Sequence, residues 1–461
     1  MAKRILPSGN DISDADAGLA MALTSAPDVA LAREATAKAA TVRPKRERYS
    51  AFAILKHALT GNRNWQPAWQ SREPKPSYDV VVIGGGGHGL ATAYYLAKRH
   101  GITNVAVIER GWIGGGNTGR NTTVVRSNYF YPESAAFYDY ALKLYADLSH
   151  ELNFNVMMSS HGVINLIQSR HQHDALMRWA NAMQINGIPC EMLDAAAVRR
   201  EIPLLKKTTD PRFPVLGGVL HRPGGTVRHD AVAWGYARGA HALGVDIVEN
   251  CEVTGFEKSG NRVTTVKTSR GDIACGRAAM AVSGHSTILA RFAGFRLPIT
   301  SYALQALVSE PVKPVLHRTV LSGSTGMYVS QSEKGELVIG GGLDLYPSYA
   351  QRGNLPVTQE TIAGLLDAFP TFSRLRMMRQ WAGVVDVTAD SSPILGKTPV
   401  DNLYIDCGFG TGGFKAIPAG GATLAHTIAH DRAHPLIEPF GLERFTSGAL
   451  VDEGAASGIA H

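Results

Sequence analysis

Three glycines and one glutamate stand at the spacing that binds a dinucleotide. Segment 78–90 reads YDVVVIGGGGHGL and contains the pattern GxGxxG, at Gly84, Gly86 and Gly89. In this pattern the first glycine permits a tight turn, the second lets the backbone approach a pyrophosphate, and the third lets a helix pack on a strand. Glu109 follows about 20 residues later, where a carboxylate accepts hydrogen bonds from ribose hydroxyls and repels a 2′-phosphate, which disfavours NADP.

A strand, a helix and a second strand must hold these residues. Residues 80–83 are apolar throughout, which is typical of a buried parallel strand. Residues 91–100 predict a helix whose amino end brings partial positive charge to the phosphates. Residues 105–108 predict the second strand, which ends beside Glu109. Further cofactor contacts are expected from Gly87, His88 and Arg110.

Two more glycine-rich segments favour FAD over NAD. Segment 111–123 (GWIGGGNTGRNTT) is also rich in hydroxyl groups, and segment 406–415 (DCGFGTGGFK) precedes a helix-like stretch at 420–430. A second loop of this kind fits a long dinucleotide whose flavin extends past the strand ends, and the helix could stabilise negative charge on the flavin. The cofactor contacts expected here are Gly116, Asn117, Thr118, Asn121, Thr122, Thr123, Gly410, Thr411, Gly412, Gly413, Phe414 and Lys415, together with Val253 from the strand-like segment 251–256.

Length and composition indicate a globular protein of two domains. The chain has 461 residues, of which 44% are hydrophobic and 18% charged, and its net charge is +7. Because dense basic residues occur only at 43–48 (RPKRER), an anionic ligand explains this charge better than nucleic acid or a membrane surface. The four cysteines are scattered, which argues against a disulfide framework or a metal site. No secretory or membrane-spanning segment is found, so we expect a cytoplasmic protein.

The order of elements predicts an α/β (α+β) fold, in which a Rossmann-type FAD-binding domain is interleaved with a sheet-rich substrate domain. Residues 1–48 are expected to be a poorly ordered extension with a short helix possible at 28–40. Trp65 and Trp69 mark a lead-in segment that we expect to pack against the rest of the protein. The predicted limits are 49–77 for the lead-in segment, 78–160, 230–297 and 386–461 for the FAD-binding domain with the C-terminal tail, and 161–229 and 298–385 for the substrate domain.

Long stretches of the chain resemble the beta subunits of heterotetrameric sarcosine oxidases, a family within the D-amino-acid oxidase superfamily of flavoproteins. The resemblance covers residues 49–461. It is carried by SYDVVVIGGGGHGLATAYYLAKRHGITNVAVIERGW, GRNTTVVRSNY, GGTVRHDAVAWGYAR, VDIVENCEVTGF, LQALVSE, YVSQSEKGELVIG, TGGFKAIPAGG and LAHTIAHD. It implies a fold like that of D-amino-acid oxidase and non-covalent FAD. Residues 1–48 match nothing recognised in this family.

The resemblance also implies roles for three residues. Arg126, in TTVVRSNY, and Lys415, in TGGFK, match the two cations that bind the substrate carboxylate, and such a grip would orient the substrate against the flavin. His229 matches the histidine that carries covalent FMN; without the family it would be interpreted as a histidine beside an N-cap at Asp230. Monomeric relatives place a lysine over the flavin to activate oxygen. Val338 stands there in matching register, which favours electron transfer from FAD to FMN.

The resemblance implies the oxidative demethylation of sarcosine, within a complex that also contains alpha, gamma and delta subunits and binds tetrahydrofolate through alpha. No general base is assigned, because desolvation alone can lower the pKa of the amine. Tyr129 and Tyr328 are interpreted as core or rim aromatics rather than pocket residues. The alternatives are the catalytic subunit of N-methylglutamate dehydrogenase, another N-methyl amino acid oxidase, or a nucleotide-binding subunit without chemistry. A NAD-dependent dehydrogenase would be excluded by a yellow protein.

Overall fold

The computed structural model describes residues 50–63, 67–207 and 213–451. The predictions made for residues 1–48, including the helix at 28–40, and for Trp65 lie outside the described residues. The chain divides into two compact units, residues 1–59 and residues 60–461. In the first unit, α3 (Ala51–Leu59) is an apolar helix that buries none of its side chains. The second unit contains all the predicted site residues.

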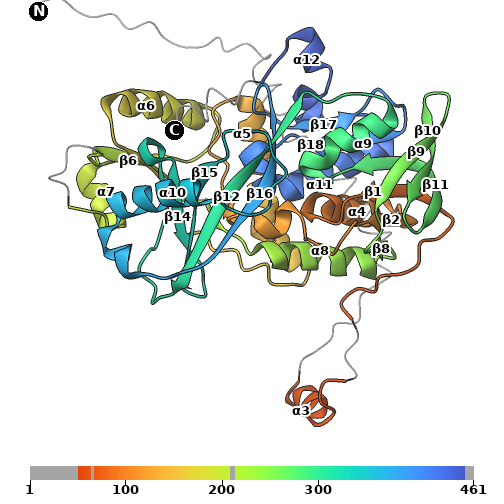
Figure 1. Ribbon diagram of the computed structural model, residues 1–461, viewed down its shortest axis with the longest axis horizontal. Helices are drawn as coiled ribbons and strands as arrows, with labels where there is room; N and C mark the ends of the chain where they lie inside the picture. Colours follow the sequence, from red (N-terminus) through yellow and green to blue (C-terminus); the bar gives the residue numbers. More distant parts are fainter. Residues whose placement is uncertain (1–49, 64–66, 208–212, 452–461) are drawn as a thin grey trace, which may run out of the picture. The chain divides into compact units, whose positions relative to one another are not determined.

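The first sheet of the larger unit is mainly parallel (Figure 1). Its strands follow the order β17-β18-β11-β1-β2-β8, and the hairpin of β9 and β10 pairs with β11. Neighbours from β18 to β8 are parallel, whereas β17 runs antiparallel to β18. The bounds are β1 (Ser77–Ile83), β2 (Val105–Ile108), β8 (Asp246–Val248), β9 (Val253–Ser259), β10 (Arg262–Thr268), β11 (Gly271–Met280), β17 (Ile394–Lys397) and β18 (Leu403–Cys407).

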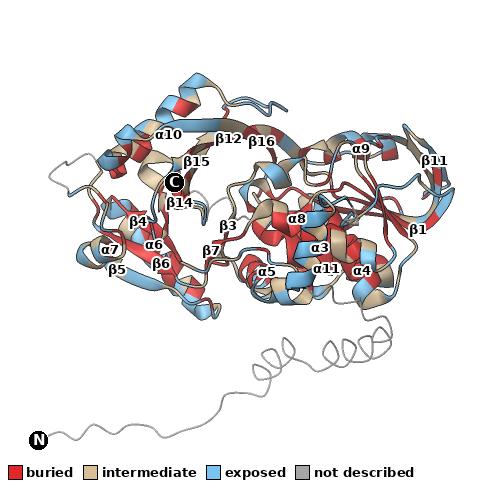
Figure 2. Ribbon diagram, turned by 90° about the horizontal axis from the view of Figure 1, so that it is seen from below, coloured by how far each residue is buried: buried red, intermediate tan, exposed pale blue. Residues whose placement is uncertain are grey.

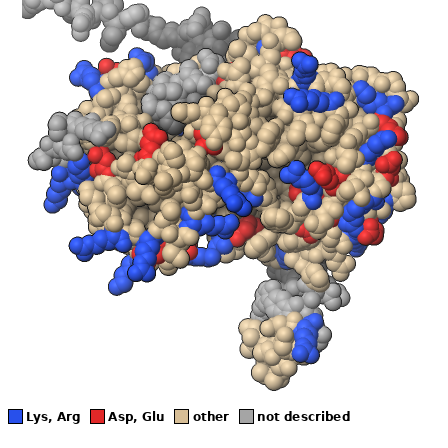
Figure 3. Space-filling model, in the orientation of Figure 1, with Lys and Arg blue, Asp and Glu red and all other residues tan. Residues whose placement is uncertain are grey.

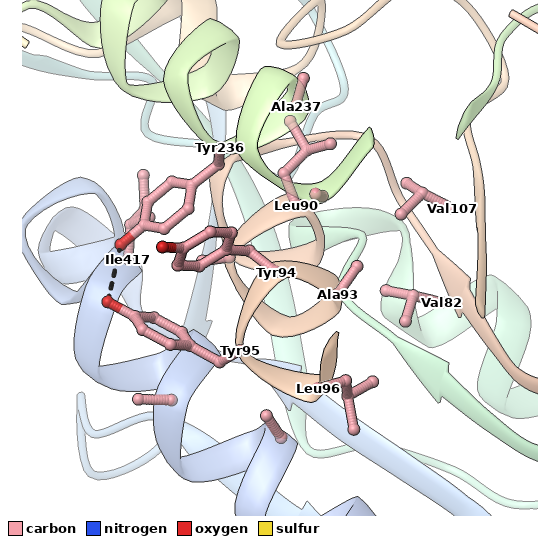
Figure 4. Close-up of a cluster of buried hydrophobic side chains, with 14 of the residues drawn as sticks. Val82, Leu90, Ala93, Tyr94, Tyr95, Leu96, Val107, Tyr236, Ala237 and Ile417 are labelled. Carbon is pink, nitrogen blue, oxygen red and sulfur yellow. Dashed lines mark hydrogen bonds between the residues drawn. The ribbon is translucent and has the colours of Figure 1, made fainter. Parts of the chain in front are cut away.

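Strand β1 is apolar because both of its faces are buried. Val80 and Val82 join one hydrophobic cluster, whereas Val81 and Ile83 join another on the opposite face. Figure 4 shows the first cluster, where the hydroxyl groups of Tyr95 and Tyr236 are hydrogen-bonded at 3.2 Å. Four helices build that cluster against the sheet: α4 (Gly87–His100), α5 (Pro132–Glu151), α8 (His229–Ala242) and α11 (Gly413–His430).

The second sheet is largely antiparallel, and its two long strands β12 and β16 extend toward the first sheet (Figure 1). Its order is β16-β12-β15-β14-β13-β4-β6-β5. The bounds are β4 (Val163–Ile167), β5 (Glu191–Asp194), β6 (Gly217–His221), β12 (Ile299–Pro311), β13 (Thr319–Ser322), β14 (Met327–Gln331), β15 (Glu336–Leu343) and β16 (Met377–Thr388). A small third sheet joins β3 (Val124–Val125) to β7 (Gly225–Thr226).

The remaining helices cover the sheets or join their strands. Figure 2 shows that the buried residues lie in the sheets and on the helix faces turned toward them. The α-helices are α6 (Arg170–Ile185), α7 (Ala195–Glu201), α9 (Ser286–Ala293), α10 (Leu355–Ala368) and α12 (Arg444–Ser447). The 3-10 helices are η1 (Asn117–Arg120), η2 (Ser283–His285), η3 (Gly323–Thr325), η4 (Pro370–Arg374), η5 (Gly410–Gly412) and η6 (Pro435–Phe440).

The predicted α/β fold is confirmed, with two corrections to helix starts. Strands β1 and β2 occur where the glycine motif predicts them, whereas helix α4 begins at Gly87 instead of the predicted 91. Helix α11 also begins earlier than predicted, at Gly413 instead of 420. The predicted domain limits remain a prediction.

Three general features of the described residues bear on function. None of the described helices is long and apolar enough to cross a membrane. Basic and acidic side chains are mixed over the face drawn in Figure 3. Within the same described part of the chain, no group of His, Cys, Asp and Glu residues could hold a metal ion.

Candidate active site

A cavity of about 1110 Å³ lies between the glycine loops of the first sheet and the strands of the second. Of the predicted site residues, Gly89 and His229 do not line it. All the others do: Gly84, Gly86, Gly87, His88, Glu109, Arg110, Gly116, Asn117, Thr118, Asn121, Thr122, Thr123, Arg126, Val253, Gly410, Thr411, Gly412, Gly413, Phe414 and Lys415. The fold therefore gathers three glycine-rich segments, far apart in sequence, around one space large enough for a dinucleotide and a small substrate.

The first glycine loop has the geometry that the motif predicts. Gly84 has φ +113°, and a Cβ atom there would collide with the carbonyl oxygen of Ala281. A Cβ atom on Gly89 would collide with the carbonyl oxygen of Gly84, so the helix can approach the strand only with glycine at this position. The Gly87 N–H donates to Thr118 Oγ1 at 2.9 Å and thereby joins the first loop to the second. The loop therefore presents backbone groups to the cavity.

The Glu109 carboxylate is held by hydrogen bonds from two backbone N–H groups. Its Oε2 accepts from the Gly85 N–H and its Oε1 from the Gly111 N–H, each at 2.8 Å. Each carboxylate oxygen has a further lone pair, so ribose hydroxyls could still donate to it. The arrangement fits the predicted ribose contact.

His88 connects the first glycine loop to the third. Its Nδ1 lies 3.1 Å from Asp406 Oδ2 and its Nε2 lies 2.8 Å from the Gly413 carbonyl oxygen. Both partners are acceptors, so both ring nitrogens must donate and the ring is an imidazolium. Burial opposes this charge, but Asp406 and Gly413 outweigh it and raise the pKa of His88. The sequence placed His88 at the cofactor without indicating this charge.

Lys415 is buried beside the half-buried Arg126. Lys415 is 7% exposed, and its Nζ donates to the Thr411 carbonyl oxygen at 3.1 Å. Burial and then repulsion from Arg126 lower the pKa of Lys415 well below its usual value. Arg126 donates to Asn128 Oδ1 at 2.7 Å, and the described residues offer neither cation a carboxylate within salt-bridge distance. Two cations without a counter-ion make a site for an anion.

Two stacked tyrosine rings lie next to Arg126 and Lys415. The Arg126 guanidinium carbon lies 5.2 Å and the Lys415 Nζ 5.9 Å from the ring centre of Tyr129. Tyr129 in turn stacks on Tyr138 at 3.8 Å. Tyr129 and Tyr328 both line the cavity, and Tyr129 also packs against a hydrophobic core cluster. Sequence spacing could not reveal this, because the residues meet only through the fold.

Two hydrogen-bond donors that the sequence did not indicate also border the cavity. Asn128 and Trp179 line it and are buried, with exposed fractions of 0% and 3%. The Asn128 Nδ2 and Trp179 Nε1 atoms have no hydrogen-bond partner. Since buried donors are rarely left unpaired, a bound ligand would account for both.

Val338 does not line the cavity. On the same strand, β15, Gly341 and Leu343 do. In sequence, Val338 matches the lysine that activates oxygen in monomeric relatives, but Val338 does not lie at the cavity. Lys415 is nevertheless the one lysine among the described lining residues, so this cavity has no second lysine for oxygen activation.

His229 lies at the start of α8, outside the cavity lining. Its Nδ1 is buried without a partner, while the ring is hydrogen-bonded to the backbone of Gly119. Burial is the largest effect on the ring and lowers the pKa of His229, so the imidazole is neutral at pH 7. Asp230 is not the N-cap, as the sequence suggested: Arg228 is, and Arg228 Nε donates to Asp230 Oδ1 at 2.7 Å. A neutral imidazole with a free nitrogen suits covalent attachment to an electrophilic carbon.

The site and fold together define a flavin-dependent oxidoreductase, and comparison with known proteins agrees. The sequence model of the FAD dependent oxidoreductase family (DAO) matches residues 79–427. The chain therefore belongs to this family. The crystal structure of L-proline dehydrogenase from P. horikoshii superposes with a TM-score of 0.77 at 27% identity, covering 82% of this chain and 100% of that one.

Within the family the chain is similar to the beta subunits of sarcosine oxidases. It is 52% identical to the sarcosine oxidase subunit beta of Rhodobacter capsulatus, over 90% of this chain and 100% of the relative. It is also 52% identical to that of Rhizobium meliloti, over 88% and 97%. FAD-dependent amine oxidation by this chain is thereby established, and so is the resemblance found from the sequence.

Proposed function

We propose that this chain oxidises sarcosine as the beta subunit of a four-subunit sarcosine oxidase. The observation that carries the proposal is the buried Lys415 beside the half-buried Arg126, two cations to which the described residues offer no carboxylate within salt-bridge distance. An amino acid substrate brings a carboxylate of its own, and binding it would offset the cost of keeping Lys415 charged. The names of the relatives, at 52% identity, support the same substrate.

The protein's own residues orient the substrate and hold the cofactor. Arg126 and Lys415 would fix the substrate carboxylate over Tyr129, which leaves the amine and its N-methyl group free to face the flavin. Gly84, Gly86 and the amino end of α4 would hold the pyrophosphate of FAD. Bound FAD would supply the acceptor for the hydride equivalent that leaves the methyl carbon. No side chain is assigned as a base, because desolvation favours the neutral amine.

We further propose that His229 carries covalent FMN, which receives the electrons from FAD. The unpartnered Nδ1 of a neutral ring supports this assignment. The proposed partners are alpha, gamma and delta subunits, with tetrahydrofolate bound through alpha to take the one-carbon unit, and the proposed location is the cytoplasm. If acid precipitation of the purified complex released all flavin into the supernatant, the assignment of His229 would be wrong.

A second candidate function has one observation in its favour. The unpaired donors of Asn128 and Trp179 could bind a second carboxylate, as in N-methylglutamate. The alternative function is therefore that of the catalytic subunit of an N-methylglutamate dehydrogenase.

The test is anaerobic bleaching of the flavin in the co-expressed complex, with sarcosine and N-methylglutamate supplied side by side. We expect fast bleaching by sarcosine at the lower concentration. Preferential bleaching by N-methylglutamate would support the alternative. A complex that stayed yellow with every N-methyl amino acid would instead indicate a nucleotide-binding subunit without chemistry.

A further inference from the structure

His88 is buried among hydrogen-bond acceptors. Its Nδ1 atom lies 2.9 Å and 3.1 Å from the two carboxylate oxygens of Asp406, and its Nε2 atom lies 2.8 Å from the Gly413 carbonyl oxygen. The side chains of His88 and Asp406 are only 15% and 1% exposed. A Cβ atom on Gly420 of α11 would lie 2.8 Å from both partners, so the helix closes over this ion pair. A neutral imidazole has one N–H, so loss of the proton would turn a lone pair toward one of these acceptors.

The same ring lies where two helices begin. His88 is the second residue of α4, and its Gly413 partner is the first residue of α11. The amino end of a helix carries partial positive charge, and both helices begin at the cavity, which is lined by Gly86, Gly87, Gly412 and Gly413. The charge of the ring therefore adds to two helix ends on the side of the cavity where the glycine motif predicts the pyrophosphate of FAD.

The groups around the ring favour its protonated form. Asp406 on β18 and Asp386 on β16 are the acidic groups that act on it. The other neighbours are neutral: α11 presents the Gly413 carbonyl group, and the ring of Phe409 packs at 4.5 Å. Burial opposes the charge, but these groups outweigh it and raise the pKa of His88, so the imidazolium is present at low pH and is lost as the pH rises through this raised pKa. Asp386 titrates below that range, at about 6.

We infer that His88 is a positioning residue that couples FAD binding to a proton: the chain retains the cofactor tightly only while both ring nitrogens carry hydrogen. Deprotonation would remove one hydrogen bond between the first and third glycine-rich segments and one positive charge beside the predicted pyrophosphate site. Bound FAD would in turn favour transfer of a proton from solvent to the ring, because the two binding events are reciprocal. The inference requires FAD, on which the family depends, and is independent of the substrate.

The test follows FAD release from the co-expressed complex over about pH 6.5 to 9. FAD fluorescence increases when the cofactor leaves a protein, so a dilution series gives Kd at each pH. We expect the Kd of the wild type to rise about tenfold or more across this range, since a hydrogen bond to a charged group is lost. His88→Gln, which is neutral at every pH, should bind FAD weakly throughout and lose most of this pH dependence. His88→Lys, which stays charged, should retain FAD better than His88→Gln at high pH.

His161→Gln is the matched control. His161 is also partly buried, and its ring nitrogens lie 3.3 Å and 3.0 Å from the hydroxyl groups of Ser159 and Thr319, outside the cavity lining. This variant should keep the wild-type pH profile. Lys415 also titrates below its usual range, but every protein in the comparison retains it, so the difference between the wild type and His88→Gln isolates His88.

A wild-type Kd that does not change with pH would overturn the inference. So would a Kd of His88→Gln that is raised by the same factor at every pH, because that result indicates a structural role without a proton. Thermal unfolding shows which variants fold; if His88→Gln does not, the loss of pH dependence in His88→Lys decides the question. A complex that sarcosine fails to bleach would overturn the proposed function but not this inference, because FAD release does not involve the substrate.

Discussion

Lys415 is the residue whose environment most constrains the chemistry. It is buried beside Arg126, and its pKa is depressed by burial first and by that arginine second. A charge in this position destabilises the empty protein, so its presence needs a functional reason. The proposed substrate carboxylate would provide one, since it would pair with both cations at once.

Replacement of Lys415 by methionine should weaken substrate binding and stabilise the protein. Loss of a charge-assisted hydrogen bond should raise KM about ten- to a hundredfold. Removal of a buried cation should raise the free energy of unfolding by at least about 1 kcal/mol at neutral pH. Steady-state kinetics and thermal unfolding check both effects. Lys397→Met, at a partly exposed lysine paired with Asp431, is the control, and equal effects of the two substitutions would remove Lys415 from the site.

The depressed pKa of Lys415 also predicts how ligand binding and stability respond to pH. A carboxylate without an amine, such as acetate, should bind well while Lys415 is charged and more weakly as pH rises through the depressed pKa. The unfolded chain binds the proton more tightly, so stability rises with pH between the depressed pKa and the usual lysine value. Titration of acetate binding by flavin absorbance tests this. A dissociation constant independent of pH, or the same profile in Lys415→Met, would contradict it.

Among the structural elements, the turn between β1 and α4 presents backbone groups to the proposed cofactor. Gly84 has a positive φ and lies against the Ala281 backbone, and the amino end of α4 faces the cavity. His88 then ties this turn to the start of α11 through Asp406 and Gly413. The first and third glycine-rich segments are therefore joined through the hydrogen bonds of the His88 ring.

Substitution of Gly84 by alanine should abolish FAD retention. The new methyl group would meet the Ala281 carbonyl oxygen at a φ that alanine disfavours, and the strain should cost at least about 2 kcal/mol. Flavin absorbance of the purified protein measures the loss. Gly255→Ala on β9, where a Cβ atom meets only Lys267 at 3.9 Å and no positive φ is involved, is the control. A yellow, fully loaded Gly84→Ala protein would refute the role of this turn.

At the scale of the whole molecule, a buried ion pair fixes the C-terminal segment. Arg444 on α12 donates to Asp390 Oδ2 at 2.7 Å and to Asp390 Oδ1 at 2.9 Å, and the two side chains are 3% and 0% exposed. Burial opposes the charge of Asp390, yet Arg444 keeps the pKa of that carboxyl below its usual value. The segment after α11 is thereby attached to the loop between β16 and β17.

Removal of one partner of this pair should be far more costly than removal of both. Arg444→Met leaves a buried carboxylate and should cost about 3–5 kcal/mol of unfolding free energy. Addition of Asp390→Asn should recover a large part of that loss. Denaturant unfolding of the two single variants and the double variant measures the coupling. Purely additive effects would show that the two side chains do not act as a pair.

Local sequence patterns were sufficient to predict the strand–helix–strand unit of the nucleotide-binding domain. The pattern at Gly84, Gly86 and Gly89, the apolar run of β1 and the carboxylate of Glu109 are local requirements, each met within one stretch of chain. The strand–helix–strand unit was therefore predicted correctly. Long matching stretches also identified the family, because a whole sequence preserves many independent positions at once.

The environment of the proposed substrate, in contrast, follows from contacts between distant segments of the chain. Arg126 and Lys415 are nearly 300 residues apart, and their proximity depends on how α11 packs beside β3. The charge of His88, the cavity positions of Tyr129 and Tyr328, and the exclusion of Val338 from the lining all depend on contacts between distant segments. Burial and charge pairing are properties of assembled surfaces, so residue spacing along one strand or loop cannot specify them.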